Sequence, residues 1–268
     1  ELKLTQGSIG KKDTDQVAAL AKVSESGTTL RHVYVRDMSI TGRTTVGGMI
    51  AVMKQTTAEA CSVNVEVTGG NAGGFAAEIL EGSVISNSYA KRAVDLDSFQ
   101  TAEGPQGGFA AIVKRSQLSK NFGQLSWKKT EEKNETPAAA GVVGTFIGES
   151  GTGDQTPTKI EHNISFGPAS YTFVGNQQAI AEGENYVGNY EYREGDPVSS
   201  VLPGKIEQAS EAQIQSKEFY LQTLEWQEDI WYLDDVVGGK RPRLQAEGDV
   251  YGTEENPVSV EAPEMIQE

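Results

Sequence analysis

Short runs of alternating apolar and polar positions recur along the first two thirds of this chain. Valine, isoleucine, tyrosine and phenylalanine recur at every second position of these runs, a pattern that predicts half-buried β-strands. A shorter apolar stretch and a polar turn precede most of the runs, so each strand belongs to a larger repeating unit. The runs that can be laid side by side are 30–35, 60–65, 85–90, 118–123 and 160–165.

A glycine phrase opens the repeating unit and returns at intervals of roughly 25 to 35 residues, a period typical of solenoids, propellers and arrays. The glycine-free run 17–21 suits an atypical first unit. The chain therefore predicts an all-β fold, a right-handed parallel β-helix or solenoid of about five irregular coils. The phrases are Val46-Gly47-Gly48-Met49, Ala72-Gly73-Gly74-Phe75, Gln106-Gly107-Gly108-Phe109 and, more loosely, Ala140-Gly141-Val142-Val143.

Two features of the repeat predict particular contacts. Glycine is expected where a coil bends sharply, because it reaches backbone angles closed to other residues and lets strands approach closely. Asn87, Asn121 and Asn163 recur at similar places, with Asn64 close to register. These amides predict either a hydrogen-bonded ladder along the column or turn-forming asparagines without a ladder, and the sequence leaves both open.

The repeat pattern ends near position 202. We therefore divide the chain into a solenoid at 1–202, a helix-plus-strand cap at 203–246 and an acidic linker or tail at 247–268. The cap is expected to close an open end of the column, because exposed strand edges and core need covering.

Within the cap, a helix and two strands are expected. Ser210 and Gln213 form a capping box that predicts a helix from there to about Leu224. The apolar run 230–233 reads as a strand and 241–244 as a short final one.

Charge and cysteine content narrow the classes of function. The 268 residues carry a formal net charge of −15 with scattered lysines and arginines. Nucleic-acid binding needs a basic stripe and is not expected. No run of about 18 apolar residues occurs, so no membrane insertion is expected. The single cysteine, Cys61, lies in an alternating apolar run and is expected to be a small buried hydrophobe rather than a reactive thiol.

The run 74–79, Gly-Phe-Ala-Ala-Glu-Ile, followed by 82–90, Gly-Ser-Val-Ile-Ser-Asn-Ser-Tyr-Ala, strongly resembles the GLUG repeat of bacterial surface proteins. The resemblance covers roughly 16–244 and implies a β-solenoid on a secreted or cell-wall-attached protein of a Firmicute-like, Gram-positive bacterium. GLUG arrays also occur in amino-terminal regions of M26 immunoglobulin A1-type zinc metallopeptidases, whose His-Glu-x-x-His motif this chain lacks. The segment that commonly ends such arrays is matched by Leu224, Trp226, Trp231, Pro242 and Leu244.

No catalytic, cofactor or metal site is expected within this chain. Its two histidines, His32 and His162, lie in different coils without a second His or Cys at ligand spacing, whereas zinc needs three or four converging ligands.

One enzymatic alternative fits the fold, because parallel β-helices include polysaccharide lyases and hydrolases with charged groups in a lateral groove. Asp37 beside Arg36, and Asp95 with Asp97, are the candidate groups for such a groove.

The expected function is that of a non-catalytic module of a bacterial surface protein, a stalk or an adhesive binding surface. The alternative is an accessory amino-terminal region of an M26-like peptidase, and a carbohydrate-active β-helix enzyme comes third. The polar insertions 130–137 and 148–157 are the candidate surfaces for a host protein or glycan, because insertions between repeats often line the binding face. Flanking domains of a longer precursor are the other expected partners.

Overall fold

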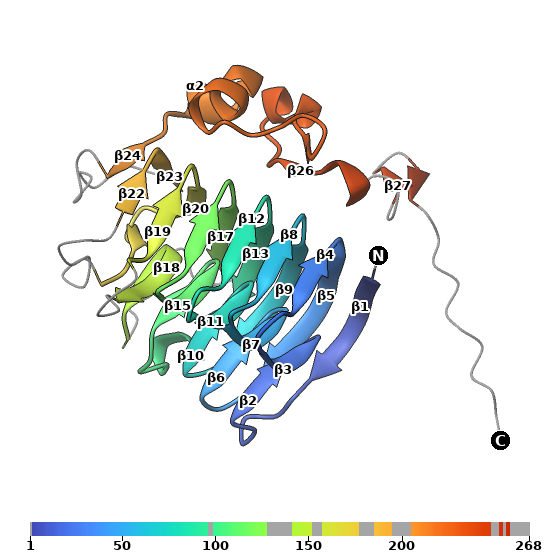
Figure 1. The fold of residues 1–268 in the computed structure, drawn as a ribbon, viewed down its shortest axis with the longest axis vertical. Helices are drawn as coiled ribbons and strands as arrows, with labels where there is room; N and C mark the ends of the chain where they lie inside the picture. The colour runs from blue at the N-terminus through green and yellow to red at the C-terminus, as the bar shows by residue number, and fades with distance from the viewer. Residues whose placement is uncertain are drawn as a thin grey trace, which may run out of the picture.

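Six turns of chain wind into one right-handed column, as a computed structural model shows (Figure 1). The structure describes residues 2–95, 99–127, 141–151, 157–176, 185–194 and 205–247, with two short strands at 252–253 and 256–257. Three sheets of parallel strands form the sides of the column. The predicted parallel β-helix is confirmed, with six turns instead of about five.

Sheets A and C each receive one strand from a turn. Sheet A has the order β1 (Leu2–Ile9), β5 (Val33–Thr41), β9 (Ser62–Thr68), β13 (Tyr89–Val94), β17 (Phe122–Trp127), β20 (Ile164–Pro168), β23 (Asn189–Glu194) and β24 (Ile206–Gln208). Sheet C has the order β4 (Thr29–Arg31), β8 (Thr57–Glu59), β12 (Val84–Ser86), β16 (Gln117–Ser119), β19 (Lys159–Glu161) and β22 (Asn185–Val187).

Sheet B bends within each turn, so the first four turns give it two strands each. The half before the bend contains β2 (Gln16–Ala18), β6 (Thr45–Gly47), β10 (Asn71–Gly73) and β14 (Gln106–Gly107). The half after it contains β3 (Ala21–Ser24), β7 (Ile50–Lys54), β11 (Ala76–Leu80) and β15 (Ala110–Lys114). In the fifth turn β18 (Val143–Gly151) spans both halves, and β21 (Thr172–Val174) of the sixth turn pairs with it.

The glycine phrases stack at the bend of sheet B, where Gly47 pairs with Gly73. A Cβ on Gly47 would lie 1.9 Å from the carbonyl oxygen of Ile50 in its own turn, and one on Gly48 would lie 1.9 Å from that of Gly74 in the next turn. Neither glycine has a left-handed φ. Close backbone approach therefore requires glycine here, and an unusual backbone angle does not.

The aromatic residue that follows each glycine pair points into the column. The rings of Phe75 and Phe109 lie 5.0 Å apart, those of Phe109 and Phe146 4.9 Å, and those of Phe146 and Phe173 4.7 Å. All four are fully buried, as is Met49 of the second turn. These distances match the spacing of adjacent parallel strands, so one continuous stack fills the core.

The fourth glycine phrase lies three residues later than the sequence predicted. Gly107 pairs with Gly144, not with Gly141, and Phe146 takes the stacking position. Thr145 stands where earlier turns have a second glycine, so the phrase 140–143 looked like the better match. The run 60–65 was likewise misaligned by two residues, because Leu30 pairs with Ala58 and not with Ala60.

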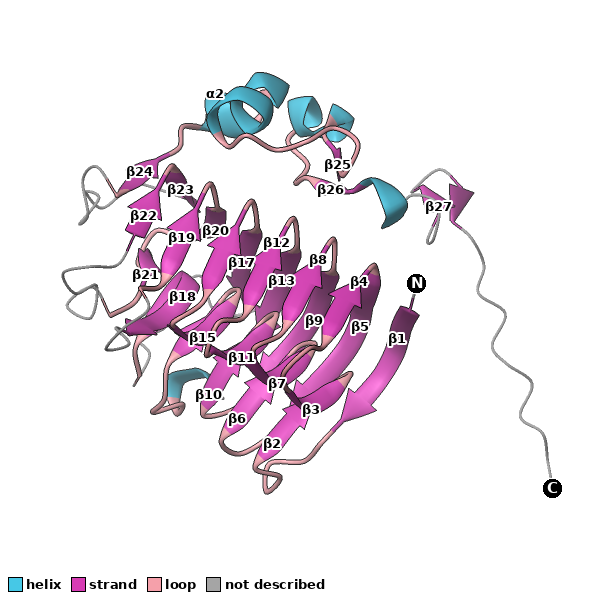
Figure 2. Ribbon diagram, viewed as in Figure 1, coloured by secondary structure: helices cyan, strands magenta, loops and turns pink. Residues whose placement is uncertain are grey.

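The described part of the C-terminal segment lies along the side of the column and not over one of its ends. Residues 209–247, which we call the strap, leave β24 at the last turn and run back over sheet A toward the first turns (Figure 1). Figure 2 shows that strands form the sides of the column, that one short helical piece lies beside β10, and that further short helical pieces lie in the strap. The strap contains α2 (Glu211–Ile214), the π-helical turn η2 (Phe219–Thr223), β25 (Trp231–Tyr232), the 3-10 helix η3 (Asp234–Gly238) and β26 (Arg243–Leu244). Beyond it, β27 (Gly252–Thr253) pairs with β28 (Asn256–Pro257).

The strap covers an aromatic stripe on the outer face of sheet A. Tyr220, Trp226 and Trp231 pack in one buried cluster with Tyr89 and Phe122 of the sheet. The end-cap prediction was wrong because the apolar surface that needs covering lies along the side of the column.

The local signals of the strap were partly correct. The capping box of Ser210 and Gln213 is present, and the two expected short strands are present as β25 and β26, which the structure pairs with each other. The α-helix ends at Ile214, however, well short of Leu224.

Candidate functional site

Asparagine side chains form a buried ladder at the corner between sheets C and A. The Oδ1 of Asn121 accepts a hydrogen bond from the backbone N–H of Ser88 at 2.9 Å, and that of Asn163 accepts one from Asn121 at 2.9 Å. Asn189, which sequence comparison missed, extends the ladder by accepting from the N–H of Asn163 at 3.1 Å. The ladder interpretation is confirmed for Asn121 and Asn163. The sequence could have revealed Asn189, because Gly188-Asn189-Tyr190 repeats the Asn position of His162-Asn163-Ile164, with which it lies in register.

Asn87 and Asn64 lie outside the ladder. Asn87 has a φ of 49° in the left-handed region, so it is the turn-forming asparagine of the second interpretation. In the third turn, Ser88 occupies the position that Asn121 and Asn163 occupy in their turns. Asn64 lies within β9 and pairs with Lys91, far from the corner. Asn87 shares its left-handed corner position with His32, Ala60, Lys120 and His162.

Cys61 occupies the ladder place of the second turn. It is fully buried, its backbone N–H donates to the Oγ of Ser88 at 3.1 Å, and its Sγ donates to the carbonyl of Glu59 at 3.3 Å. Burial raises the pKa of the Cys61 thiol to about 11. Such a thiol holds almost no thiolate at neutral pH, which agrees with a buried small residue.

The two histidines lie four turns apart on one corner. His32 is exposed, and the Nε2 of His162 lies 3.9 Å from the Oε2 of Glu225 in the strap. In the part of the chain that the structure describes, no group of three His, Cys, Asp or Glu side chains could hold a metal ion.

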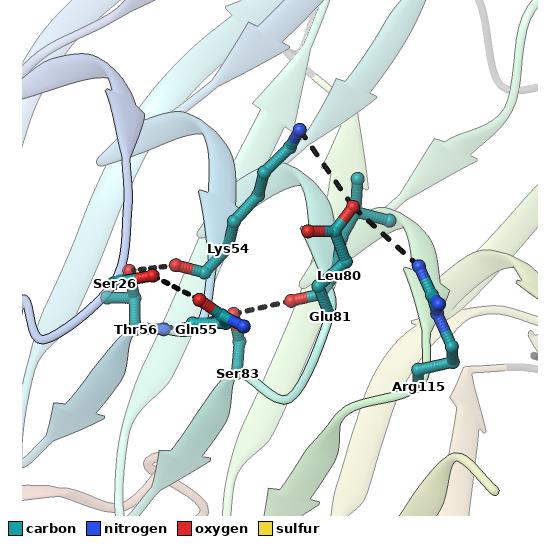
Figure 3. Close-up of polar contacts among 8 residues, drawn as sticks. All are labelled: Ser26, Lys54, Gln55, Thr56, Leu80, Glu81, Ser83 and Arg115. Atoms are coloured by element: carbon teal, nitrogen blue, oxygen red, sulfur yellow. Dashed lines mark hydrogen bonds and ion pairs between the residues drawn. The ribbon is translucent and has the colours of Figure 1, made fainter. Parts of the chain in front are cut away.

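The corner between sheets B and C carries a ridge of charges over buried hydroxyls (Figure 3). The Oγ1 of Thr56 donates to the carbonyl of Lys54 at 3.0 Å, and its backbone N–H donates to the Oγ of Ser83 at 3.3 Å. Outside, the Oε1 of Glu81 lies 3.9 Å from the Nζ of Lys54 and 3.6 Å from an Nη of Arg115. Because these ion pairs are exposed, each contributes less than about 1 kcal/mol.

The two insertions named as recognition surfaces connect different pairs of sheets. One joins β17 of sheet A to β18 of sheet B, and the other joins β18 to β19 of sheet C. All of 130–137 and half of 148–157 (152–156) lie outside the described residues, and 148–151 is strand in β18 instead of loop. Their binding role stays a prediction.

The charged groups named for an enzymatic groove lie at different heights along the strands of sheet A, with Asp37 in the middle of β5 and Asp95 just after the end of β13. The Nε of Arg36 lies 3.8 Å from the Oδ2 of Asp37, which occupies a bulge of β5 with a φ of 56°. Asp95 follows the end of β13, and Asp97 lies outside the described residues. A carboxylate pair there stays a prediction.

Glu247, at the end of the strap, anchors it to sheet A. Its Oε1 accepts from the Oγ of Ser62 at 2.6 Å and from the phenol of Tyr89 at 2.5 Å, and its Oε2 accepts from the N–H of Leu244 at 3.1 Å. Burial, together with the charge of Glu247, raises the pKa of Tyr89 well above its ordinary value. The strap is therefore tied to the second and third turns through one buried carboxylate.

A buried arginine braces the corner between sheets A and B from inside. Arg92 donates to the carbonyls of Ala72 at 2.8 Å and Val67 at 3.0 Å and to the Oε1 of Gln106 at 2.6 Å. Burial lowers the pKa of Arg92 to about 9.

Outside this corner is a shallow hollow of about 450 Å³, lined by three successive turns and by Lys12.

No family model matches the chain, and no curated protein matches it either. A solved structure described as an IgA1 protease matches with a TM-score of 0.51 at 15% identity, covering 74% of this chain but only 16% of that one. A Bacteroides ovatus protein named after the immunoglobulin A1 proteases matches with a TM-score of 0.49 at 15% identity, covering 91% of this chain and 74% of that one. The first likeness shows a shared solenoid fold, and the GLUG resemblance stays a prediction from the sequence.

Among the described residues, no helix is long and apolar enough to cross a membrane.

Proposed function

We propose that this chain is a non-catalytic spacer and presentation module of an exported bacterial protein, of the kind represented by the IgA1 proteases. The observation that carries the proposal is the continuous, filled interior of the column. Stacked rings occupy its centre and buried ladders hydrogen-bond its corners. Six turns at about 4.8 Å each give a rigid element roughly 30 Å long.

The likeness to an IgA1 protease chain supports placing the module in such a protein. A solenoid there would hold a catalytic region or its substrate at a set distance, because its turns contact only their neighbours and resist bending. The stalk or adhesive role on another surface protein is the second candidate, and the same rigidity favours it.

The proposal is tested with purified chain and human IgA1. We expect no cleavage of the heavy chain under conditions in which an active IgA1 protease cleaves it completely. In the parent protein, deletion of the column is expected to leave cleavage of a short hinge peptide unchanged and to slow cleavage of intact IgA1. Heavy-chain cleavage by the isolated chain would refute the non-catalytic assignment. Equal rates on intact IgA1 with and without the column would refute the accessory role.

A further inference from the structure

Four partly exposed hydrogen-bond donors lie side by side on the outer face of sheet A. Register pairs Arg36 with Asn64, Asn64 with Lys91, and Lys91 with Gln124, on the adjacent strands β5, β9, β13 and β17. Neighbouring members stand about 4.8 Å apart, the spacing of strands in a sheet. We call these four residues the donor row.

The strap adds further cations beside the donor row. Burial lowers the pKa of Lys91, and the guanidinium groups of Arg36, Arg241 and Arg243 lower it further, against the opposite effect of Glu247. The guanidinium of Arg241 lies 4.2 Å from the ring centre of Phe166, which pairs with Gln124 at the end of the row. Arg243 directly precedes Leu244, whose backbone N–H donates to Glu247. Four cations around one buried carboxylate form a positive region on a chain whose net charge is −15.

Two of these cations lie over aromatic rings, and within the described part of the chain neither has a hydrogen bond or an ion pair at salt-bridge distance. The Nζ of Lys91 lies 5.3 Å from the ring centre of Tyr89 and 5.9 Å from that of Phe122. The guanidinium of Arg243 lies 4.0 Å from the ring centre of Tyr232. Both side chains are partly buried. A partly desolvated cation gains most from an anion that can also accept its hydrogen bonds.

We propose that the donor row and Arg243 bind an anionic glycan, with Lys91 and Arg243 on its carboxylate or sulfate groups and the amides of Asn64 and Gln124 on its hydroxyl groups. Within the described residues neither amide side chain has a hydrogen-bond partner, and both are partly exposed. A linear sugar chain can follow the row from turn to turn, because the donors repeat along the column axis.

The surroundings favour a glycan over an acidic peptide. Strands β9, β13 and β17 are paired on both sides, so no sheet edge is open there to add a peptide strand. The aromatic stripe next to the row is covered by the strap, which removes the apolar pockets that peptide side chains would need.

The test uses the full purified chain with dextran sulfate and polygalacturonate as sulfate and carboxylate probes, and with neutral dextran and polyglutamate as comparisons. We expect binding of at least one acidic polysaccharide, weakening as salt rises above about 0.1 M. The double substitution K91Q/R243Q is expected to weaken this binding about tenfold or more. The matched control K11Q/K22Q changes net charge equally at exposed sites outside the donor row, in the turn after β1 and in β3, and is expected to bind like the unaltered chain.

A second variant keeps the proposal testable even if the double substitution misfolds. Asn64→Asp places a carboxylate in the row without removing a described side-chain hydrogen bond, and it should weaken binding while leaving the thermal unfolding midpoint nearly unchanged. The preference between the two polysaccharides identifies the acidic group that is bound. Failure to bind either polysaccharide, an equal loss in K11Q/K22Q, or equally tight binding of polyglutamate would each overturn the proposal.

Discussion

The Oδ1 of Asn163 accepts two hydrogen bonds from Asn121, one from its backbone N–H at 2.9 Å and one from its Nδ2 at 3.0 Å. Asn163→Ala leaves that buried N–H without its partner, and we expect it to lower the free energy of unfolding by about 2 kcal/mol. Urea unfolding followed by circular dichroism measures the change. Asn64→Ala is the control, because Asn64 lies on the partly exposed face of sheet A outside the ladder, and it should change stability by less than about 0.5 kcal/mol. Equal losses in both variants would show that the ladder bonds contribute nothing particular.

The glycine bend gives a second prediction. A Cβ on Gly74 would lie 2.1 Å from the carbonyl oxygen of Gly108 in the next turn. Gly74→Ala therefore forces two turns apart and should cost about 3 kcal/mol or prevent folding. Gly238→Ala meets no atom within 4 Å and should be neutral or slightly stabilising. Comparing soluble yield and thermal midpoint of the two variants tests the argument, which fails if Gly74→Ala behaves like Gly238→Ala.

The thiol of Cys61 should be unreactive in the folded protein. Its thiol is fully buried and its pKa is raised to about 11, so the reactive thiolate is scarce at neutral pH. We expect almost no reaction with a thiol reagent at pH 7 in buffer, and complete reaction of the one thiol in denaturant. Because the folded pKa lies above the unfolded one, the protonated thiol favours the folded state, and this contribution is lost as pH rises from about 9 through 11. Rapid labelling of the folded chain at pH 7 would contradict this.

The buried carboxylate of Glu247 should control attachment of the strap. Glu247→Gln replaces an acceptor of three hydrogen bonds with a neutral amide, and we expect a loss of about 2 kcal/mol. Hydrogen exchange should quicken mainly in 219–247 and less in the interior strands of sheet B. The exposed Glu103→Gln serves as the control, and uniform quickening throughout the column would argue against a local anchor.

Arg92 should be structural although it is charged. Arg92→Met leaves the carbonyls of Val67 and Ala72 without their donor, and we expect destabilisation of about 3 kcal/mol. Arg115→Met, on the exposed ridge, is expected to cost less than about 1 kcal/mol. Denaturation midpoints distinguish the two, and a smaller loss for Arg92→Met than for Arg115→Met would refute the bracing role.

The sequence by itself determined the column, because a period-two pattern and a recurring glycine phrase each demand the same local geometry in every turn. It aligned the glycine pairs at Gly73 and Gly107 correctly and offered the ladder at Asn121 and Asn163 as one of two interpretations, whereas the stack of aromatic rings behind the glycines came from the structure. The sequence misaligned the fifth turn, where Gly144-Thr145 replaces the glycine pair. With only one glycine at the bend, Gly141 and Gly144 were both possible matches for Gly107.

Only the tertiary structure decided where the strap lies and which side chains meet beneath it. Ser62 and Tyr89 contact Glu247 across 185 and 158 residues of sequence, and no local pattern encodes such a distance. The donor row likewise arises from strand register, since Arg36, Asn64, Lys91 and Gln124 belong to four separate turns. A one-residue shift of register would turn such side chains to the opposite face, so the sequence spacing alone could not place them together.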